Sequence, residues 1–187
     1  MAHITSSSQW FKSPLTLLNQ ICDYISLTFY SFLLAKLLVT TGDGSGSTIS
    51  EIIDLLNPNA TCQNWVDYPI DLGWAVGQIV DNFPHICGGY RSGKGFKECY
   101  KITPQSAVSL PNLPIGKWYS SAGVFNNTLF TIGGYACDSG CDPLNNTEYI
   151  SESSIQNGPD VPIEAYDHCV IQINANEILL TGGVKSG

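Results

Sequence analysis

Short apolar runs that end in a pair of glycines recur along this chain at a nearly constant interval. The pairs are Gly88-Gly89, Gly133-Gly134 and Gly182-Gly183, and a weaker copy of the run ends at Gly42. From Gly42 to Gly88 is 46 residues, from Gly88 to Gly133 is 45, and from Gly133 to Gly182 is 49. Runs this short are typical of strands, and a fixed interval of this length predicts a repeat architecture.

The features between the glycine pairs also return in the same order. A proline followed by isoleucine stands 19, 19 and 20 residues before the glycine, and an aromatic residue opens the next strand. The prolines are Pro69, Pro114 and Pro162, and the aromatic residues that we expect at matching positions are Trp74, Trp118 and Tyr166. Two-residue polar turns at Asp81-Asn82 and Asn126-Asn127 predict hairpins. Four short strands per repeat is the pattern of a β-propeller blade.

The glycine-pair strand, its hairpin partner and the interval of 45–49 residues together resemble the kelch repeat over about residues 37–187. The resemblance implies an all-β chain folded as a kelch-type β-propeller. The expected blades are partial ones at 37–69 and 166–187 and complete ones at 74–114 and 118–162. In such a blade the glycines are packing residues, because each permits a positive φ and the close approach of a neighbouring blade.

The blade count bears on how this propeller would close. About three to three and a half blades are expected, whereas propellers close with about four to eight. An open propeller exposes apolar blade faces. We therefore expect a fragment of a longer propeller, with closure by oligomerisation as the alternative.

Residues 1–36 do not match the repeat. Their cleanest apolar run, from Ile25 to Leu34, has the length of a signal-peptide core and is too short to span a bilayer. Three interpretations stay open for this segment: a signal peptide or signal anchor, a degenerate innermost strand of the first repeat, and a segment foreign to the fold. A membrane is expected as a partner only through such an anchor.

Cysteines and glycosylation sequons point to a location. The chain has seven cysteines, a high number for a cytosolic domain. Cys87 and Cys99 flank a predicted loop, and Cys137 and Cys141 bound a tight one, so both pairs are candidate disulfides. Sequons in expected loops begin at Asn59, Asn126 and Asn145. Together these features predict a secreted glycoprotein, with a membrane-anchored or cytoplasmic protein as the alternatives.

The motifs that could carry chemistry are incomplete. Residues 88–95 nearly spell a phosphate-binding loop, but Gly95 replaces the hydroxyl residue and a strand is expected to follow. Cys137 and Cys141 lack two further metal ligands nearby. His168 and Cys169 are neighbours on one strand and point to opposite faces. No catalytic residue, cofactor or metal is therefore expected, and a net charge of −8 argues against a nucleic-acid partner.

The resemblance and the missing catalytic constellation predict a non-catalytic binding module for protein or glycan partners outside the cell. An intracellular kelch adaptor is one alternative. The other is a fragment of an enzyme similar to galactose oxidase, a copper enzyme that also has a kelch propeller. Its tyrosine–cysteine cofactor and histidine ligands have no counterpart here.

Overall fold

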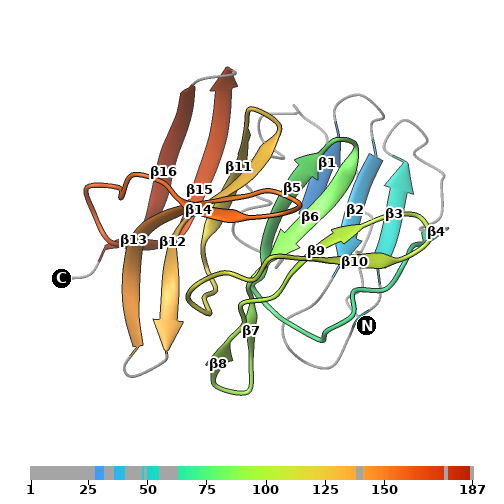
Figure 1. The fold of residues 1–187 in the computed structure, drawn as a ribbon, viewed down its shortest axis with the longest axis horizontal. Helices are drawn as coiled ribbons and strands as arrows, with labels where there is room; N and C mark the ends of the chain where they lie inside the picture. The colour runs from blue at the N-terminus through green and yellow to red at the C-terminus, as the bar shows by residue number, and fades with distance from the viewer. Residues whose placement is uncertain are drawn as a thin grey trace, which may run out of the picture.

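The structure is a computed structural model that describes residues 28–31, 36–40, 48, 50–54, 63–137, 141–174 and 177–185. These residues form sixteen strands and, among them, no helix (Figure 1). No described helix therefore has the length and apolar character needed to cross a membrane. Gly42, Asn59 and residues 1–27 lie outside the described residues, so the expectations placed on them are not addressed by the structure.

The first sheet is a four-stranded antiparallel meander. Its strands, in order, are β1 (Thr28–Ser31), β2 (Lys36–Thr40), β3 (Ser50–Asp54) and β4 (Gln63–Asn64). Strand β1 belongs to the segment 1–36, which does not match the repeat in sequence, yet it pairs with β2 over its whole length. A part of that segment thus supplies one edge strand of the first sheet.

Two more four-stranded meanders follow in the expected order. The second sheet has β5 (Val76–Val80), β6 (Phe83–Cys87), β9 (Cys99–Ile102) and β10 (Ala107–Leu110), and the third has β11 (Ser121–Phe125), β12 (Thr128–Cys137), β13 (Cys141–Ile150) and β14 (Ile155–Asn157). The last hairpin consists of β15 (Ala165–Asn174) and β16 (Glu177–Lys185). A small ribbon, β7 (Tyr90–Arg91) with β8 (Lys94–Gly95), projects from the second sheet. This arrangement is compatible with a β-propeller.

The expected hairpin turns are present in the second and third sheets. Asp81 and Asn82 join β5 to β6, and Asn126 and Asn127 join β11 to β12; all four have φ between 46° and 64°. Two successive left-handed residues make a type I′ turn, whose twist matches that of antiparallel strands. The glycine pairs lie at the opposite ends of these hairpins (Figure 1).

The structure corrects the register of the aromatic residues by one position. Gly73 pairs with Tyr90, Trp118 with Tyr135, and Tyr166 with Val184, each partner being the residue after a glycine pair. The counterpart of Trp118 is therefore Gly73, and Trp74 matches Tyr119 instead. The prediction that Trp74, Trp118 and Tyr166 occupy matching positions was wrong for Trp74, because a proline-to-strand spacing in sequence does not fix which residue pairs.

Apolar cores lie between neighbouring sheets. One core contains Tyr68, Leu72, Ile86 and Ile102, with Ile52 of the first sheet packed against it. The other joins the second and third sheets through residues that include Val80, Leu110, Leu113, Leu129 and Ile150. Because consecutive sheets pack face to face, the strand end that carries a glycine pair lies against the next sheet.

Two glycines show why that approach needs a residue without a side chain. A Cβ on Gly88 would lie 2.6 Å from the carbonyl oxygen of Lys117, and one on Gly133 would lie 2.5 Å from that of Ala165. Both glycines have positive φ, 68° and 54°. Gly182 has φ 71° but nothing within 4 Å of its Cβ position, since no described strand packs beyond the last hairpin.

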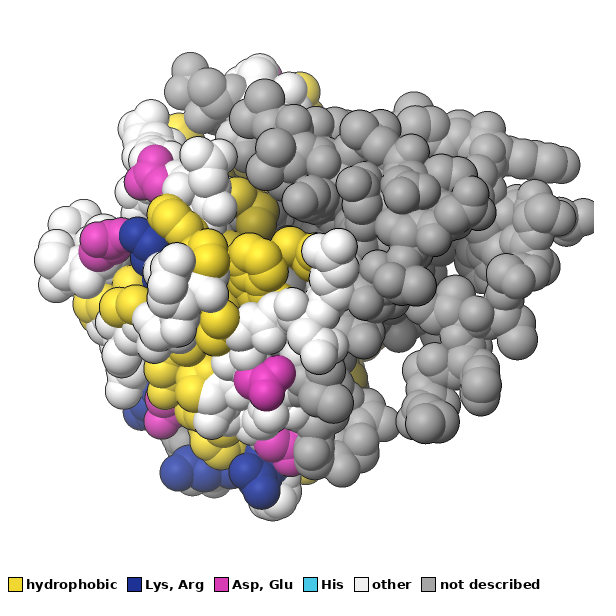
Figure 2. Space-filling model, turned by 90° about the vertical axis from the view of Figure 1, so that its right-hand side faces the viewer, with side chains coloured by type: hydrophobic (Ala, Val, Ile, Leu, Met, Phe, Trp, Pro, Cys, Tyr) yellow, Lys and Arg dark blue, Asp and Glu magenta, His cyan; other side chains and the backbone are white. Residues whose placement is uncertain are grey.

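Apolar surface also remains on the outside. Several large side chains of the last hairpin are exposed, among them Ile171 at 42%, Ile173 at 61% and Leu179 at 47%. Figure 2 views the molecule from the side where Figure 1 places β3 and β4, and hydrophobic side chains form a band down the described part of that face. Basic side chains gather at its lower end, the end of the molecule where β7 and β8 project.

Candidate functional site

Six aromatic rings meet at the glycine-pair ends of the second sheet, the third sheet and the last hairpin. We call them the aromatic band: Trp74, Tyr90, Trp118, Tyr119, Tyr135 and Tyr166. The contacts form a closed circuit in the order Trp74, Tyr90, Trp118, Tyr135, Tyr166, Tyr119 and back to Trp74. Ring centroids in contact are 4.9–6.4 Å apart and the rings are tilted, a geometry in which aromatic pairs attract.

The glycine pairs place two of these rings. Tyr90 and Tyr135 each follow a pair directly, where the chain has just turned with two positive φ values. Tyr135 then exchanges two backbone hydrogen bonds with Trp118, at 2.8 and 3.1 Å, and Tyr90 exchanges two with Gly73, at 2.7 and 3.0 Å. These bonds tie the residue after each glycine pair to the segment that opens the same sheet.

A bend in the opening segment places two more rings. Trp74 and Tyr119 both have φ 53°, and Asp167, the matching residue of the last hairpin, has φ 56°. The left-handed conformation costs a non-glycine residue about 1–2 kcal/mol. Because it recurs at three matching positions, the bend is a property of the repeat, and it brings the rings of Trp74 and Tyr119 to a centroid separation of 5.2 Å.

The aromatic band is partly exposed to solvent except at Trp118. Trp118 is buried, with 6% of its surface exposed, while the other five aromatic residues are half-buried. Partly exposed rings offer apolar faces, and four of the six carry a phenol that can donate and accept hydrogen bonds. Such a surface suits the apolar faces of sugars and the side chains of a protein partner.

Charged groups lie beside the aromatic band. Arg91 Nε is 3.8 Å from Asp71 Oδ2, next to Tyr90. Partial burial raises the pKa of the Tyr119 phenol, and the nearby carboxylate of Asp167 raises that pKa further. Tyr119 therefore keeps its proton at physiological pH and remains a hydrogen-bond donor.

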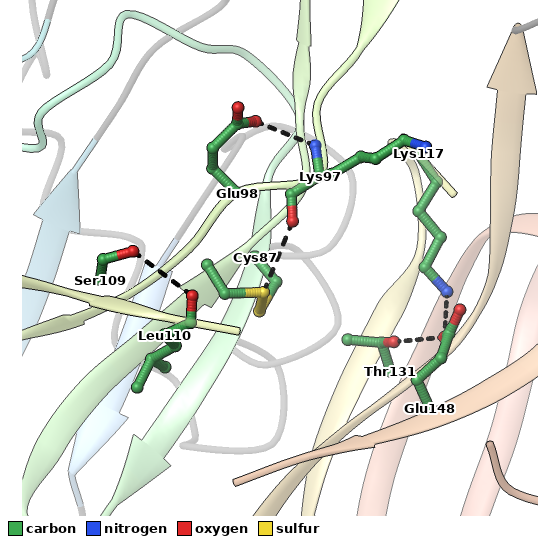
Figure 3. Close-up of a disulfide and its surroundings, with 9 residues drawn as sticks. Cys87, Lys97, Glu98, Ser109, Leu110, Lys117, Thr131 and Glu148 are labelled. Carbon is green, nitrogen blue, oxygen red and sulfur yellow. Dashed lines mark hydrogen bonds and ion pairs between the residues drawn. A yellow bond between two sulfur atoms is a disulfide. The ribbon is translucent and has the colours of Figure 1, made fainter. Parts of the chain in front are cut away.

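A buried ion pair fixes the segment that carries Trp118 and Tyr119. Lys117 Nζ lies 2.6 Å from Glu148 Oε2, and both side chains are fully buried (Figure 3). Thr131 Oγ1 donates to the same carboxylate oxygen at 2.8 Å, and Asn146 Nδ2 donates to Oε1 at 2.5 Å. Burial lowers the pKa of Lys117, and the charge and hydrogen bond of Glu148 oppose that effect.

The backbone of Lys117 reaches the second sheet while its side chain reaches the third. Its carbonyl accepts a hydrogen bond of 2.8 Å from Gly89 N, and its amide donates to Phe96 O at 3.2 Å. Lys117 thus connects two sheets at the point where the aromatic band begins. Since neither charged group is exposed, the pair positions the band and does not meet ligands.

Both candidate cysteine pairs form disulfides, and both lie near the aromatic band. Cys87 and Cys99 join β6 to β9 with 4.1 Å between Cα atoms, directly before the first glycine pair (Figure 3). Cys137 and Cys141 close the tip of the β12–β13 hairpin with 4.2 Å between Cα atoms. Cys169 is disulfide-bonded as well. The disulfides Cys87–Cys99 and Cys137–Cys141 both hold a segment that follows a glycine pair.

The other candidate residues do not form a catalytic group. The segment that resembles a phosphate-binding loop forms the ribbon of β7 and β8, and no helix follows it. His85 and His168 lie on different sheets. Among the described residues, no group of three or more His, Cys, Asp or Glu side chains could hold a metal ion.

The two described sequons differ in setting, since Asn126 lies at the end of the sheet away from the aromatic band and Asn145 lies near Tyr135. Asn126 is exposed in the β11–β12 turn. Asn145 is half-buried within β13, and the threonine of its sequon, Thr147, is buried. The expectation that both lie in loops holds for Asn126 and was wrong for Asn145, because β13 continues through that segment.

Half of the aromatic band was not predicted. Tyr90, Tyr119 and Tyr135 were missed, whereas Trp74, Trp118 and Tyr166 were noted as strand openers. A signal for two of them exists, because tyrosine follows a glycine pair directly at both Tyr90 and Tyr135. Tyr119 could be found only from the one-residue shift that the strand pairing reveals.

Comparison with known proteins supports the fold. No protein-family model and no curated protein matches the chain. Among solved structures the chain is similar to YjhT, with a TM-score of 0.66 and 13% sequence identity over 79% of this chain. The matched part is 54% of that structure, so the chain spans about half its length. The similarity supports an all-β fold of antiparallel four-stranded sheets, compatible with a propeller.

Proposed function

We propose that this chain is a non-catalytic, kelch-type propeller module that binds protein or glycan partners outside the cell through the aromatic band. The observation that carries the proposal is the closed circuit of six rings, five of them half-buried, contributed by three successive repeats. Aromatic residues that combine an apolar face with a polar tip are typical of recognition surfaces.

The setting of the aromatic band supports recognition in preference to catalysis. The charged groups beside it are the Arg91–Asp71 pair and the carboxylate of Asp167, which adds to burial in raising the pKa of the Tyr119 phenol, whereas a catalytic site needs a base, an acid and a nucleophile placed together. The buried Lys117–Glu148 pair holds the scaffold rigid beneath it. A preorganised surface reduces the entropy that a ligand must offset on binding.

The cysteine pairs favour a location outside the cell, and the net charge bears on the kind of ligand. Two cysteine pairs at disulfide distance hold the hairpins next to the aromatic band, and such bonds persist in oxidising compartments. The net charge of −8 favours neutral or basic ligands over polyanions.

A binding screen with three proteins tests the proposal. The intact chain, Trp74→Ala and Phe83→Ala are applied to a glycan array and used to capture extracellular proteins. Phe83 is also a half-buried aromatic, but it lies beside the turn at 81–82, at the end of β6 away from the glycine pair, so it is the matched control. We expect a ligand that the intact chain and Phe83→Ala retain and that Trp74→Ala loses. Turnover of a ligand, or equal binding by all three proteins, would contradict the proposal.

A further inference from the structure

The turn between β11 and β12 has an unusual combination of sequence and shape. It reads Phe125-Asn126-Asn127-Thr128, and Phe125 pairs directly with Thr128 across the hairpin. Asn126 has φ 46° and Asn127 has φ 59°, which gives a type I′ turn. Paired residues of an antiparallel hairpin point to the same face of the sheet, so the ring of Phe125 and the hydroxyl of Thr128 share one face.

The two asparagines of the turn differ in what they contact. Asn127 Nδ2 donates to the carboxylate of Asp81, in the matching turn of the second sheet. The Asn126 side chain is exposed and makes no hydrogen bond to any described residue. Asn126 is also the first residue of a sequon completed by Thr128. The amide that a glycosyltransferase would modify is therefore the one that the fold leaves accessible.

An open pocket of about 290 Å³ begins at this asparagine. Phe125, Asn126 and Thr128 line it together with Tyr149 of β13, Gln156 of β14, and Ser151 and Ser154 of the turn between those strands. The rings of Phe125 and Tyr149 are 6.3 Å apart between centroids. The pocket thus joins an apolar aromatic wall to a rim of hydroxyl and amide groups, the composition of a small-ligand site, and its volume is near the lower end of the usual range of about 300–1,000 Å³.

We propose that Asn126 carries an N-linked glycan whose first N-acetylglucosamine folds back onto Phe125 and occupies this pocket. Aromatic ring faces are electronegative, so they attract the weakly positive C–H groups on the face of a sugar. The sugar hydroxyls and acetamido group would meet Ser154 and Gln156 at the polar rim. The proposal rests on the secretory route of the proposed function.

The covalent step requires a donor of known chemical class, an oligosaccharide linked to a polyprenyl pyrophosphate. A bond forms between Asn126 Nδ2 and C1 of the N-acetylglucosamine. The bond from C1 to the pyrophosphate oxygen breaks, that oxygen leaves with the electron pair, and the amide nitrogen releases one proton. The step is a substitution at C1, and it involves no oxidation or reduction.

Asn145 provides an internal contrast. Its sequon lies in β13, where the Asn145 carbonyl accepts a hydrogen bond of 2.8 Å from Val161 N and Asn146 donates to the buried Glu148. The sequon threonine, Thr147, is only 6% exposed. A sugar on Asn145 would start from a half-buried position inside a strand and not from an exposed turn, so we expect no comparable stabilising contact there.

The test uses the whole chain, secreted from eukaryotic cells and trimmed with an endoglycosidase that leaves a single N-acetylglucosamine. Peptide mass spectrometry measures occupancy of Asn126. Melting temperatures are then compared for the trimmed protein and Asn126→Gln, each with Phe125 and with Phe125→Leu. We expect the single sugar to raise the melting temperature by about 2–4 °C, the shift that one aromatic contact gives in a chain of this size. We expect Phe125→Leu to remove that gain.

Two results would overturn the proposal: an Asn126 that stays unmodified in the secreted protein, or a sugar-dependent gain that is the same with leucine at position 125. If Phe125→Leu does not fold, Phe125→Tyr keeps the ring and must keep the gain, and Tyr149→Leu must reduce it. Ligand binding by the aromatic band at the other end of the strands is measured on the same samples. It should be unaffected by Asn126→Gln, so failure of this proposal and failure of the proposed function give different results.

Discussion

Single glycines decide how closely the sheets can approach. At Gly88 the left-handed backbone and the Lys117 carbonyl, 2.6 Å from a Cβ position, act together, whereas Gly182 combines a similar φ with open space. Comparing Gly88 with Gly182 therefore separates the free-energy cost of the backbone conformation from the cost of a steric clash. The same argument explains why the segment that resembles a phosphate-binding loop is a packing device.

We predict that Gly182→Ala costs about 1–2 kcal/mol of unfolding free energy, the price of a left-handed alanine. Gly88→Ala should cost about 2–5 kcal/mol, because overpacking adds to the same conformational term. Urea denaturation of both variants measures the difference. Equal losses would show that the Lys117 carbonyl moves away without cost, contrary to the rigid approach described here.

His168 is a residue whose charge the fold disfavours. It is buried, and its ring nitrogens meet no partner with hydrogen-bond geometry among the described residues. Burial lowers its pKa to about 4, although the nearby Ile132 carbonyl opposes part of that effect. Burial lowers the pKa of His85 as well.

A pH dependence follows from the sign of this shift. Because the pKa of His168 is lower in the folded chain, its stabilising effect is complete above pH 6.5, the ordinary value, and is lost as the pH falls towards 4. The unfolding free energy should therefore fall over this interval in the wild type and fall less in His168→Gln. Denaturation at pH 7 and pH 4.5 measures both slopes, and His85→Gln is the control that keeps the contribution of His168. Parallel slopes for wild type and His168→Gln would refute this account.

At the scale of elements, the junction between the second and third sheets depends on the Lys117–Glu148 pair. The matching residues of the other repeats are apolar: Leu72 comes before Gly73, and Ala165 approaches Gly133 as Lys117 approaches Gly88. The repeat therefore does not require a charge at this position. Because a lone buried charge is costly, the charge of Lys117 needs Glu148 as its partner.

We predict that Lys117→Met and Glu148→Gln each cost about 3–5 kcal/mol, because each leaves one buried partner unpaired. The double variant should lose less than the sum of the two, since methionine fills the space and the glutamine amide can accept from Asn146 Nδ2 through its oxygen and donate to the Thr131 hydroxyl through its nitrogen. A double-mutant cycle by urea denaturation measures the coupling. Additive losses would mean that the two side chains do not act as a pair.

The sequence predicts those elements whose conformation depends only on neighbouring residues. The glycine pairs and the two-residue turns at 81–82 and 126–127 lie where the sequence placed them, because positive φ and hairpin twist depend on neighbouring residues. The participation of β1 agrees with one of the three interpretations left open for residues 1–36. The pairing of Trp74 and the ion pair were not predictable. Both depend on which residue of a distant strand lies opposite, and no local pattern encodes that choice.

At the scale of the whole molecule, successive sheets bring one end of each repeat to a common place. Six rings that are up to 92 residues apart in sequence, from Trp74 to Tyr166, form one circuit there. The other end presents the type I′ turns and the pocket at Asn126. We thus propose ligand recognition at one end of the sheets and a carbohydrate modification at the other.

The affinity ratio between two aromatic substitutions decides whether the aromatic band binds the ligand. Once the screen has supplied a ligand, titration calorimetry measures its Kd for wild type, Trp74→Ala and Phe83→Ala. Loss of a stacking aromatic at a recognition surface is worth about 1–3 kcal/mol, so Trp74→Ala should bind about 5–150-fold more weakly. Phe83→Ala should bind as the wild type does. A Trp74→Ala variant that folds and binds with unchanged Kd would contradict the role of the aromatic band.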